Sequence, residues 1–330
     1  MYSLITKHTL KIVLLFISFY WLMVAESCHS KNASIVVDKT KLPQRFLVVL
    51  GITQDAGYPQ IGCEKECCNA YWQGREEKKH ITCLALVDNA TKQYWLLDAM
   101  PDITQQLHTV QSYINTTPNY SPNGIFITHA HIGHYAGLME LGREAMGAKS
   151  IPVFAMPRLD SFLTNNGPWS QLVALQNIRL QKLKADSAVT LNASLKITPV
   201  KVPHRDEFSE TVGFIIESNK KKILFIPDID KWEKWDKDII AQIGKVDMAL
   251  LDGTFYINGE LPGRDMKEVP HPFVEESMHR FSLLPTTEKS KIVFIHFNHT
   301  NPLLKNESAE KSAVKDAGFG VAEEGRVIEL

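Results

Sequence analysis

The 330-residue sequence has no excess of charge of either sign: Lys and Arg number 36, Asp and Glu number 37, and the formal net charge is −1. A protein whose main work is to bind nucleic acid normally carries a clear basic excess, so nucleic acid is not an expected partner. Low-complexity sequence is lacking, and neither a Ser/Gly linker nor a block of like charges divides the chain. With 44% hydrophobic and 22% charged residues, the composition is typical of a globular protein with a large core.

The N-terminal apolar run, residues 12–24, is shorter than the roughly 20 residues that a membrane-spanning helix needs. Two lysines precede it and a small-x-small exit follows, which is the pattern of a secretory signal peptide. We therefore expect a signal peptide at 1–27, a flexible linker at 28–45 and one domain at 46–330. The protein is expected to be exported, either as a periplasmic protein after ordinary cleavage or as a lipoprotein anchored by acylated Cys28.

Apolar segments and turn signals form a similar order in the two halves of the domain, with strand pairs first and helices later. This order favours an α/β fold in which two sheets pack face to face with helices outside. The strands are expected at 46–51, 81–87, 94–97, 124–128, 195–202, 211–217, 222–226, 246–251, 291–296 and 325–330. The helices are expected at 101–114, 135–147, 232–243 and 272–281.

Three histidines with the spacing H-x-H-x-x-H, His129, His131 and His134, follow a short buried strand and precede a helix. A turn at this place can direct three imidazoles into one space, which a helix cannot do at a spacing of two. Neutral imidazole is a standard ligand of Zn²⁺ and of other borderline metals. The histidines therefore predict a metal site, and the alternative is a surface loop with incidental histidines.

Three more polar residues, His204, Asp228 and His296, lie where apolar strands end. A sheet edge is rigid enough to fix the geometry of a site. Taken singly, each is also explained as a hydrogen-bonded structural residue, and Asp228 as a helix cap. Together with the triple they supply five imidazoles and one carboxylate, which is enough for one metal ion or two.

These residues and several flanking motifs resemble the metallo-β-lactamase superfamily. Within it, the sequence is similar to the branch that contains pyrroloquinoline-quinone biosynthesis protein B and the cyclic phosphodiesterase of the carbon–phosphorus lyase pathway. The resemblance covers nearly all of residues 46–330. Its motifs, besides the histidine triple, are Gly57-Tyr-Pro59, Asp98-Ala99-x-Pro101-Asp102, Ile226-Pro-Asp228, Asp252-Gly-Thr-Phe255 and His296-x-x-His-Thr-Asn-Pro302. It implies an αββα four-layer sandwich of two packed mixed sheets with helices outside.

The resemblance also implies metal ligands. His129, His131 and His204 would hold the first metal, Asp228 would bridge, and the second metal would be held by His134 and His296. Zn²⁺ is the default ion, with Fe or Mn as alternatives.

One departure from the family pattern H-x-H-x-D-H concerns the second metal, because Gly133 stands where the family has an aspartate. Asp230 and Asp252 are the candidates to replace the missing aspartate as a ligand. Whether the site holds one metal ion or two stays open. An aspartate introduced at position 133 is expected to tighten the second metal.

A metal with this ligand set predicts hydrolysis of an ester-, phosphodiester- or lactam-type bond in a small molecule, since a bound water with its pKa lowered to about 7 supplies hydroxide. Asp228 would position that hydroxide. His271 is a candidate proton donor or a structural histidine. Arg264 is a candidate contact for an anionic substrate; alternatively, it is a solvated loop charge without a function. Trp169 is a candidate for the lining of a substrate pocket; alternatively, it only packs against its neighbours. The alternative function lies in quinone cofactor biosynthesis or transport, either as a carrier or binding protein or through non-hydrolytic metal chemistry. The sequence leaves the oligomeric state open.

The cysteines Cys63, Cys67 and Cys68, together with His299, resemble the structural zinc site of this branch. Export favours the alternative, a disulfide among these cysteines and Cys83. Both interpretations stay open at the level of sequence.

Overall fold

A computed structural model describes residues 37–330 of the chain. The predicted signal peptide, Cys28 and the first half of the predicted linker, residues 28–36, lie outside the described residues. The last residues of that linker belong to a compact unit that runs from Asp38 to Leu330. There the short 3₁₀ helix η1 (Lys39–Lys41) is held by Lys39, whose Nζ donates to the carbonyl oxygens of Gln111 (3.0 Å) and Ile114 (2.7 Å). No helix in the described part of the chain has the length and hydropathy needed to cross a membrane.

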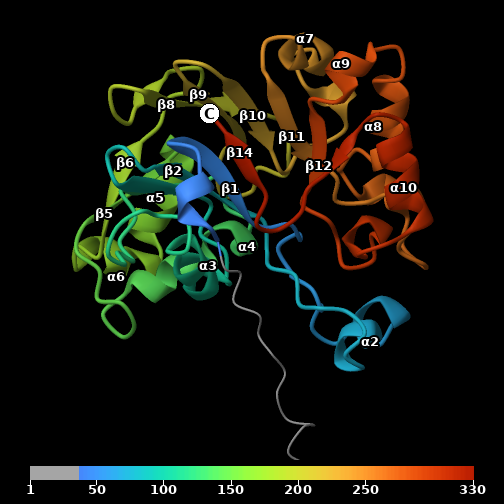
Figure 1. Ribbon diagram of the computed structural model, residues 1–330. Coiled ribbons are helices and arrows are strands. Elements are labelled where there is room, and N and C mark those ends of the chain that lie inside the picture. The colour runs from blue at the N-terminus through green and yellow to red at the C-terminus, as the bar shows by residue number, and fades with distance from the viewer. Residues whose placement is uncertain (1–36) are drawn as a thin grey trace, which may run out of the picture. The chain divides into compact units, whose positions relative to one another are not determined.

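The first sheet contains seven strands in the order β14-β1-β2-β3-β4-β5-β6 (Figure 1). Its β14-β1-β2-β3 part is antiparallel, whereas β3 to β6 are parallel. The strands are β1 (Arg45–Gly51), β2 (Cys83–Asp88), β3 (Gln93–Leu97), β4 (Gly124–Phe126), β5 (Ile151–Ala155), β6 (Ile178–Lys182) and β14 (Val327–Glu329).

The second sheet also contains seven strands, in the order β13-β12-β11-β10-β9-β8-β7. Strands β7 to β10 pair antiparallel, and β10 to β13 pair parallel. The strands are β7 (Val189–Thr190), β8 (Leu195–Lys201), β9 (Val212–Ser218), β10 (Lys222–Ile226), β11 (Met248–Asp252), β12 (Ile292–Ile295) and β13 (Gly320–Val321).

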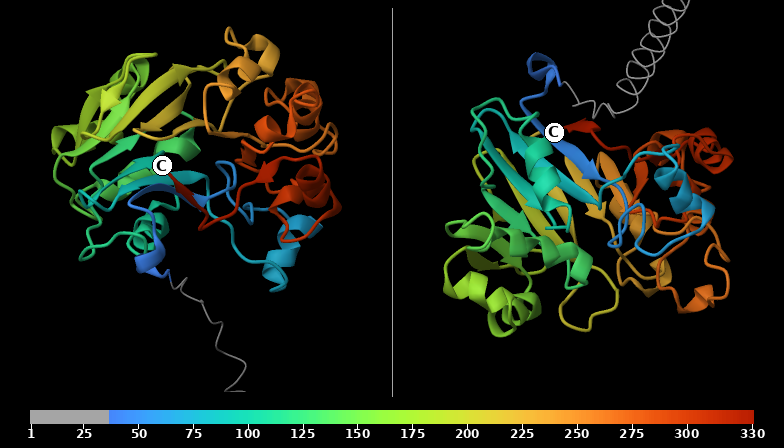
Figure 2. Two further views of the ribbon diagram at one scale, coloured as in Figure 1. Left: turned by 45° about the horizontal axis from the view of Figure 1, so that its top comes forward. Right: turned by 90° about the horizontal axis from the view of Figure 1, so that it is seen from below.

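Helices lie on the outer sides of the two sheets, α3, α5 and α6 beside the first and α7 to α10 beside the second (Figures 1 and 2). The helices are α2 (Glu66–Trp72), α3 (Ile103–Val110), α4 (Ile132–Tyr135), α5 (Pro157–Asn165), α6 (Trp169–Ala174), α7 (Ile239–Ile243), α8 (Val274–Arg280), α9 (Thr286–Lys289) and α10 (Ala309–Asp316). Short 3₁₀ helices are η2 (Ala136–Leu141), η3 (Trp232–Lys234), η4 (Met266–Glu268) and η5 (Pro302–Leu304). The predicted αββα arrangement is confirmed.

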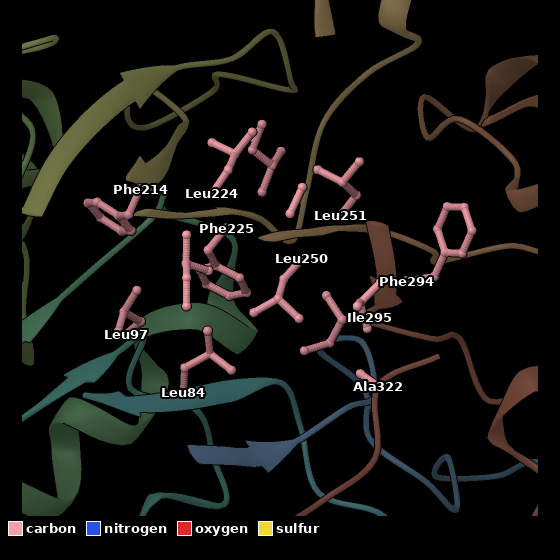
Figure 3. Close-up of a cluster of buried hydrophobic side chains, with 14 of the residues drawn as sticks. Leu84, Leu97, Phe214, Leu224, Phe225, Leu250, Leu251, Phe294, Ile295 and Ala322 are labelled. Carbon is pink, nitrogen blue, oxygen red and sulfur yellow. The ribbon is translucent and has the colours of Figure 1, made fainter. Parts of the chain in front are cut away.

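The main hydrophobic core fills the space between the sheets. In Figure 3, Leu84 and Leu97 of the first sheet face Phe225 and Leu250 of the second, and Leu251 points to the outer side of its strand. Because successive strand residues point to opposite faces, a sheet covered on both sides needs apolar residues at every position. This explains the uninterrupted apolar runs of β11 and β12.

Three predicted elements differ in the structure. The segment 135–147, expected as a helix, continues only as η2, because the Gly137 amide donates to the Ala99 carbonyl oxygen (2.8 Å) instead of extending α4. The expected helix 232–243 is divided into η3 and α7, and the side chain of Asp238 caps α7. The helix expected at 101–114 ends at Val110.

The strand order places chemically active residues together. Asp228 follows β10, Asp252 is the last residue of β11, and His296 follows β12. Since these three strands are neighbours and parallel, their carboxyl ends meet at one edge of the second sheet. Ligand sites in open α/β sheets form at such edges.

Candidate metal centre

The first cluster at this edge contains the imidazoles of His129, His131 and His204 and the carboxylate of Asp228. One donor atom from each lies within 4.8 Å of the others. His129 and His131 belong to the turn between β4 and α4, and His204 follows β8. The structure therefore brings together all four residues that the sequence assigns to the first metal.

A second cluster contains His134, His296 and Asp228, joined by a residue that the sequence analysis missed, Asp55. Oδ2 of Asp228 lies 2.9 Å from Nε2 of His134 and 3.4 Å from Nε2 of His296. Oδ1 of Asp55 lies 3.4 Å from each of the same two nitrogens. Asp228 is common to both clusters, which is the bridging position expected for it.

Six donor atoms of the two clusters, those of every member except Asp55, are buried and have no hydrogen-bond partner. Leaving such an atom unpaired costs about 1–3 kcal/mol, so buried polar atoms are nearly always bonded. Several unpaired atoms that converge on one space therefore indicate a ligand, and acceptor nitrogens beside a carboxylate fit a metal cation. The atoms are Nε2 of His129, His131, His134, His204 and His296, and Oδ2 of Asp228.

The opposite ring nitrogen, Nδ1, of four of these histidines contacts a side-chain oxygen. A contact of this kind fixes the ring and leaves Nε2 free for a metal. The pairs are His129 with Thr128 Oγ1 (3.0 Å), His134 with Asp98 Oδ2 (2.9 Å), His204 with Asp230 Oδ1 (3.3 Å) and His296 with Thr254 Oγ1 (3.0 Å).

Burial keeps His129 and His131 of the first cluster neutral. Desolvation, and then the neighbouring His134, lowers the pKa of His129 well below its ordinary value. Desolvation and the nearby His204 lower the pKa of His131 to about 4. Because a metal binds only the unprotonated nitrogen, both rings are in the binding form at neutral pH.

His271, the predicted proton donor, lies at the same edge. Its Nδ1 is 2.8 Å from Oδ2 of Asp252 and 3.4 Å from Oδ1 of Asp228. Burial lowers the pKa of His271, but the charge of Asp252 outweighs it and raises the pKa to about 9. The ring is therefore protonated at neutral pH and can donate a proton.

Neither candidate for the carboxylate missing at position 133 takes that place. Asp230 contacts His204, and Asp252 is bonded by the backbone of Ile229 and by Thr254 besides His271. The carboxylate that lies beside His134 and His296, besides that of Asp228, is that of Asp55, in the loop after β1. The expectation that an aspartate at 133 would tighten the second metal stays a prediction, and a Cβ at Gly133 would lie 2.1 Å from the Cβ of Asp55, so Asp55 would have to move.

The loop that carries His204 is held by Arg158 of α5. Its guanidinium donates to the carbonyl oxygens of Asp206 (2.9 Å), Glu207 (3.1 Å) and Ser209 (3.4 Å). The Ser209 hydroxyl accepts a hydrogen bond from the Ala130 amide (2.8 Å), within the histidine motif. The loop therefore forms one wall beside the first cluster, where Glu207 Oε2 lies 3.6 Å from the Nε2 of His131.

Trp169, predicted to line a substrate pocket, belongs to an aromatic cluster next to this loop. Its ring centroid is 4.9 Å from that of Tyr135 and 5.8 Å from that of Phe162. Phe162 in turn is 5.4 Å from Phe208, whose side chain is exposed. Tyr135 directly follows the candidate ligand His134. Arg264 is exposed in the segment between β11 and α8, and its role stays a prediction.

The cysteines form a separate cluster with His299. Sγ of Cys67 and Sγ of Cys68 lie 3.7 Å and 3.3 Å from Nδ1 of His299, and Sγ of Cys63 lies 4.0 Å from that of Cys67. All four described cysteines are free, and Cys83 is buried within β2, where its thiol donates to backbone carbonyl oxygens. The disulfide alternative is thus not formed, and the four donor atoms fit a tetrahedral zinc site.

Comparison with known proteins agrees with this geometry. Residues 94–297 match the beta-lactamase superfamily domain. The chain belongs to this superfamily. The superfamily match begins in β3 and includes His129, His131, His134, His204, Asp228 and His296.

The relatives include the coenzyme PQQ synthesis protein B of Methylorubrum extorquens, 26% identical over 86% of this chain and 99% of that protein. Among solved structures within the superfamily fold, the Zn²⁺-bound PqqB of Methylobacterium extorquens aligns with a TM-score of 0.72 and 24% identity, over 86% of this chain and 100% of that one. A diphosphatase from the PhnP family aligns with a TM-score of 0.59 and 18% identity, over 87% and 97% of the two chains. These likenesses establish the fold.

Proposed function

We propose that the protein is a metal-dependent hydrolase of a small molecule, with the metal held by the clusters around Asp228. The observation that carries the proposal is the set of converging Nε2 and Oδ2 atoms, which are buried and have no hydrogen-bond partner. Zn²⁺ is the proposed ion, because the donors are imidazole and carboxylate and because a superfamily structure contains Zn²⁺. When bound, the metal would polarise the scissile bond and activate a water.

The residues around the metal each have a defined task in this proposal. Asp228 accepts from the attacking water and orients it, since its two oxygens face both clusters. His271 carries the proton that the leaving group takes up, and Asp252 holds the His271 ring in place. Asp98 and Thr254 fix the rings of His134 and His296. General acid catalysis of this kind contributes typically 10²–10⁴-fold in rate.

Hydrolysis of an ester or phosphodiester is proposed as the reaction class, since a diphosphatase is among the fold neighbours. The aromatic cluster of Trp169, Phe162 and Phe208 is proposed as the substrate-facing wall. Phe208 is 59% exposed although it lies only four residues from the ligand His204. An exposed ring next to a polar centre suits an apolar part of the substrate.

A second candidate is a carrier or binding role in quinone cofactor biosynthesis, favoured by the relatives named for coenzyme PQQ synthesis. The catalytic proposal is preferred because a proton donor, His271, faces the same carboxylate as the metal ligands. A carrier needs no such group.

The test combines elemental analysis of the purified protein with hydrolysis assays on bis(p-nitrophenyl) phosphate, p-nitrophenyl esters and nitrocefin. The hydrolase is supported if a chelator removes both the metal and the turnover, and if added metal restores the turnover. Bound metal without turnover on this panel supports the carrier, and protein without metal at the histidines contradicts both. His279, which is exposed on α8, provides a matched histidine control as His279→Ala.

A further inference from the structure

Gly133 is not required by the backbone at its position. It is the second residue of the short helix α4, and it is not among the glycines with positive φ. Within a helix, glycine is about 1 kcal/mol less favourable than alanine. The reason for glycine at this position must therefore lie in the space around it.

That space is filled by Asp55. A Cβ built on Gly133 would lie 2.1 Å from the Cβ, 2.7 Å from the Cα and 2.9 Å from the Cγ of Asp55. A side chain at position 133 would overlap with Asp55, so it can be present only if Asp55 moves. The two residues are 78 positions apart in the sequence, so the fit between them depends on the fold.

Asp55 is held in this place from the side of His296. The Gln54 amide donates to the Phe297 carbonyl oxygen (2.9 Å), and the Phe297 amide donates to the Ile52 carbonyl oxygen (2.8 Å). The side-chain amide of Gln54 also donates to Asn298 (3.1 Å). The loop after β1 and the end of β12 are thus fixed to each other on both sides of the two candidate ligands.

The charges at this place favour a cation. Three carboxylates, Asp55, Asp98 and Asp228, each have an oxygen within 3.4 Å of a nitrogen of His134. Asp98 is bonded by the amide (2.7 Å) and the hydroxyl (3.0 Å) of Thr128, whereas Asp55 and Asp228 converge on imidazole nitrogens, and buried charge without a partner is costly. A divalent ion beside His134 and His296 would balance the charge.

We propose that Asp55 is the carboxylate ligand of a second metal ion, supplied by the loop after β1 instead of by position 133, and that Gly133 exists to make room for it. The centre then binds two ions, one held by His129, His131 and His204 and one by Asp55, His134 and His296, with Asp228 between them. This inference rests on the proposed metal centre and assigns its second half.

If the proposal is right, the aspartate at position 55 and the glycine at position 133 can be swapped, provided that both are changed together. Asp55→Gly removes the carboxylate and opens the space, and we expect it to bind one metal ion fewer per chain than the native protein. Gly133→Asp places two carboxylates in one volume, and it is expected to lower the metal count or the melting temperature. The double variant Asp55→Gly/Gly133→Asp is expected to regain both the native metal count and the native melting temperature.

The measurement is metal per chain by elemental analysis after equilibration with Zn²⁺ and dialysis, with circular dichroism as the check of folding. Asp55→Asn keeps the shape of the side chain and tests the charge alone, and Asp236→Asn changes an exposed aspartate as the control. A native metal count in both Asp55→Gly and Asp55→Asn would overturn the proposal, as would a double variant no better than Asp55→Gly. If the native protein itself holds no metal at its histidines, the proposed function fails instead.

Discussion

The cysteine cluster and the histidine–aspartate centre, both able to hold metal, are assembled in different ways. The cysteine cluster takes three of its four donors from residues 63–68. The other centre takes its donors from five separate segments between residues 55 and 296, each placed by the end of a strand. A local cluster stabilises a loop, whereas a centre built from many strand ends depends on the whole sandwich. Side-chain oxygens that contact the Nδ1 atoms of its histidines hold the imidazole rings in place. We expect the first to serve structure and the second to serve chemistry.

The largest effect is expected from His204→Ala, which removes a ligand of the first cluster. Loss of an outer partner of a ligand typically costs 10–100-fold, so loss of the ligand itself should lower hydrolysis by more than about a hundredfold. Metal at the cysteine cluster should remain, because the two clusters share no residue. Metal analysis and rate measurement beside His279→Ala check this, and an unchanged rate would remove His204 from the centre.

The variant His271→Gln is expected to lose hydrolysis but to keep its bound metal. The rate should fall by about 10²–10⁴-fold while the metal count stays native, since the proton donor is lost and the ligands are kept. Substrates with good leaving groups, which need no proton, should lose less. If metal is lost in proportion to activity, His271 acts as a ligand and its assignment as a proton donor is wrong.

An intermediate effect is expected in Asp98→Asn, which weakens the contact that orients His134. The affinity for metal at the histidine–aspartate centre should fall by about 10–100-fold, with the cysteine cluster unaffected. Titration against a competing chelator measures it. Asp88→Asn alters another buried aspartate, bonded to Arg45 (3.1 Å) far from the centre, and separates this effect from a general loss of stability. Equal affinities in the two variants would contradict the account.

The smallest effect concerns the order in which the thiols react once metal is removed. Burial raises the pKa of Cys68 to about 12. Burial also raises that of Cys63, but hydrogen bonds from Lys65 and from the neighbouring thiols outweigh it and lower the pKa below the ordinary value. Because the thiolate is the reactive form, Cys63 should be alkylated first and Cys68 last of the three. Mass spectrometry after chelation gives the order, and rapid labelling of all three without chelator would argue against a bound metal.

The sequence was sufficient for the sandwich and for most of the residues that the structure brings together in the two clusters. The histidine motif and the polar residues after apolar strands can be recognised in the sequence. A strand that is buried on both faces is a continuous apolar run, so the residue at which it ends is easily located. Strand β5 was missed since Pro152 argues against a strand, and β6 because Arg179 and Gln181 interrupt its apolar pattern at a sheet edge.

Asp55 could not be assigned from the sequence, although its loop stood out as rich in Gly, Pro and Cys. Its role depends on a steric fit with Gly133, and no pattern along the chain reports a contact between segments so far apart. Spacing likewise could not show that Asp230, which follows β10, and Asp252, at the end of β11, lie outside the cluster of His134 and His296. Only the positions of the side chains show that these two bond to His204 and His271.

The central claim is that buried imidazoles converge on metal, and anomalous diffraction from a crystal of the Zn²⁺-equilibrated protein tests it most directly. The account predicts anomalous density at the zinc edge among the Nε2 atoms of His129, His131 and His204 and the carboxylate of Asp228. Density at the cysteine cluster alone, with those nitrogens facing only water, would contradict it.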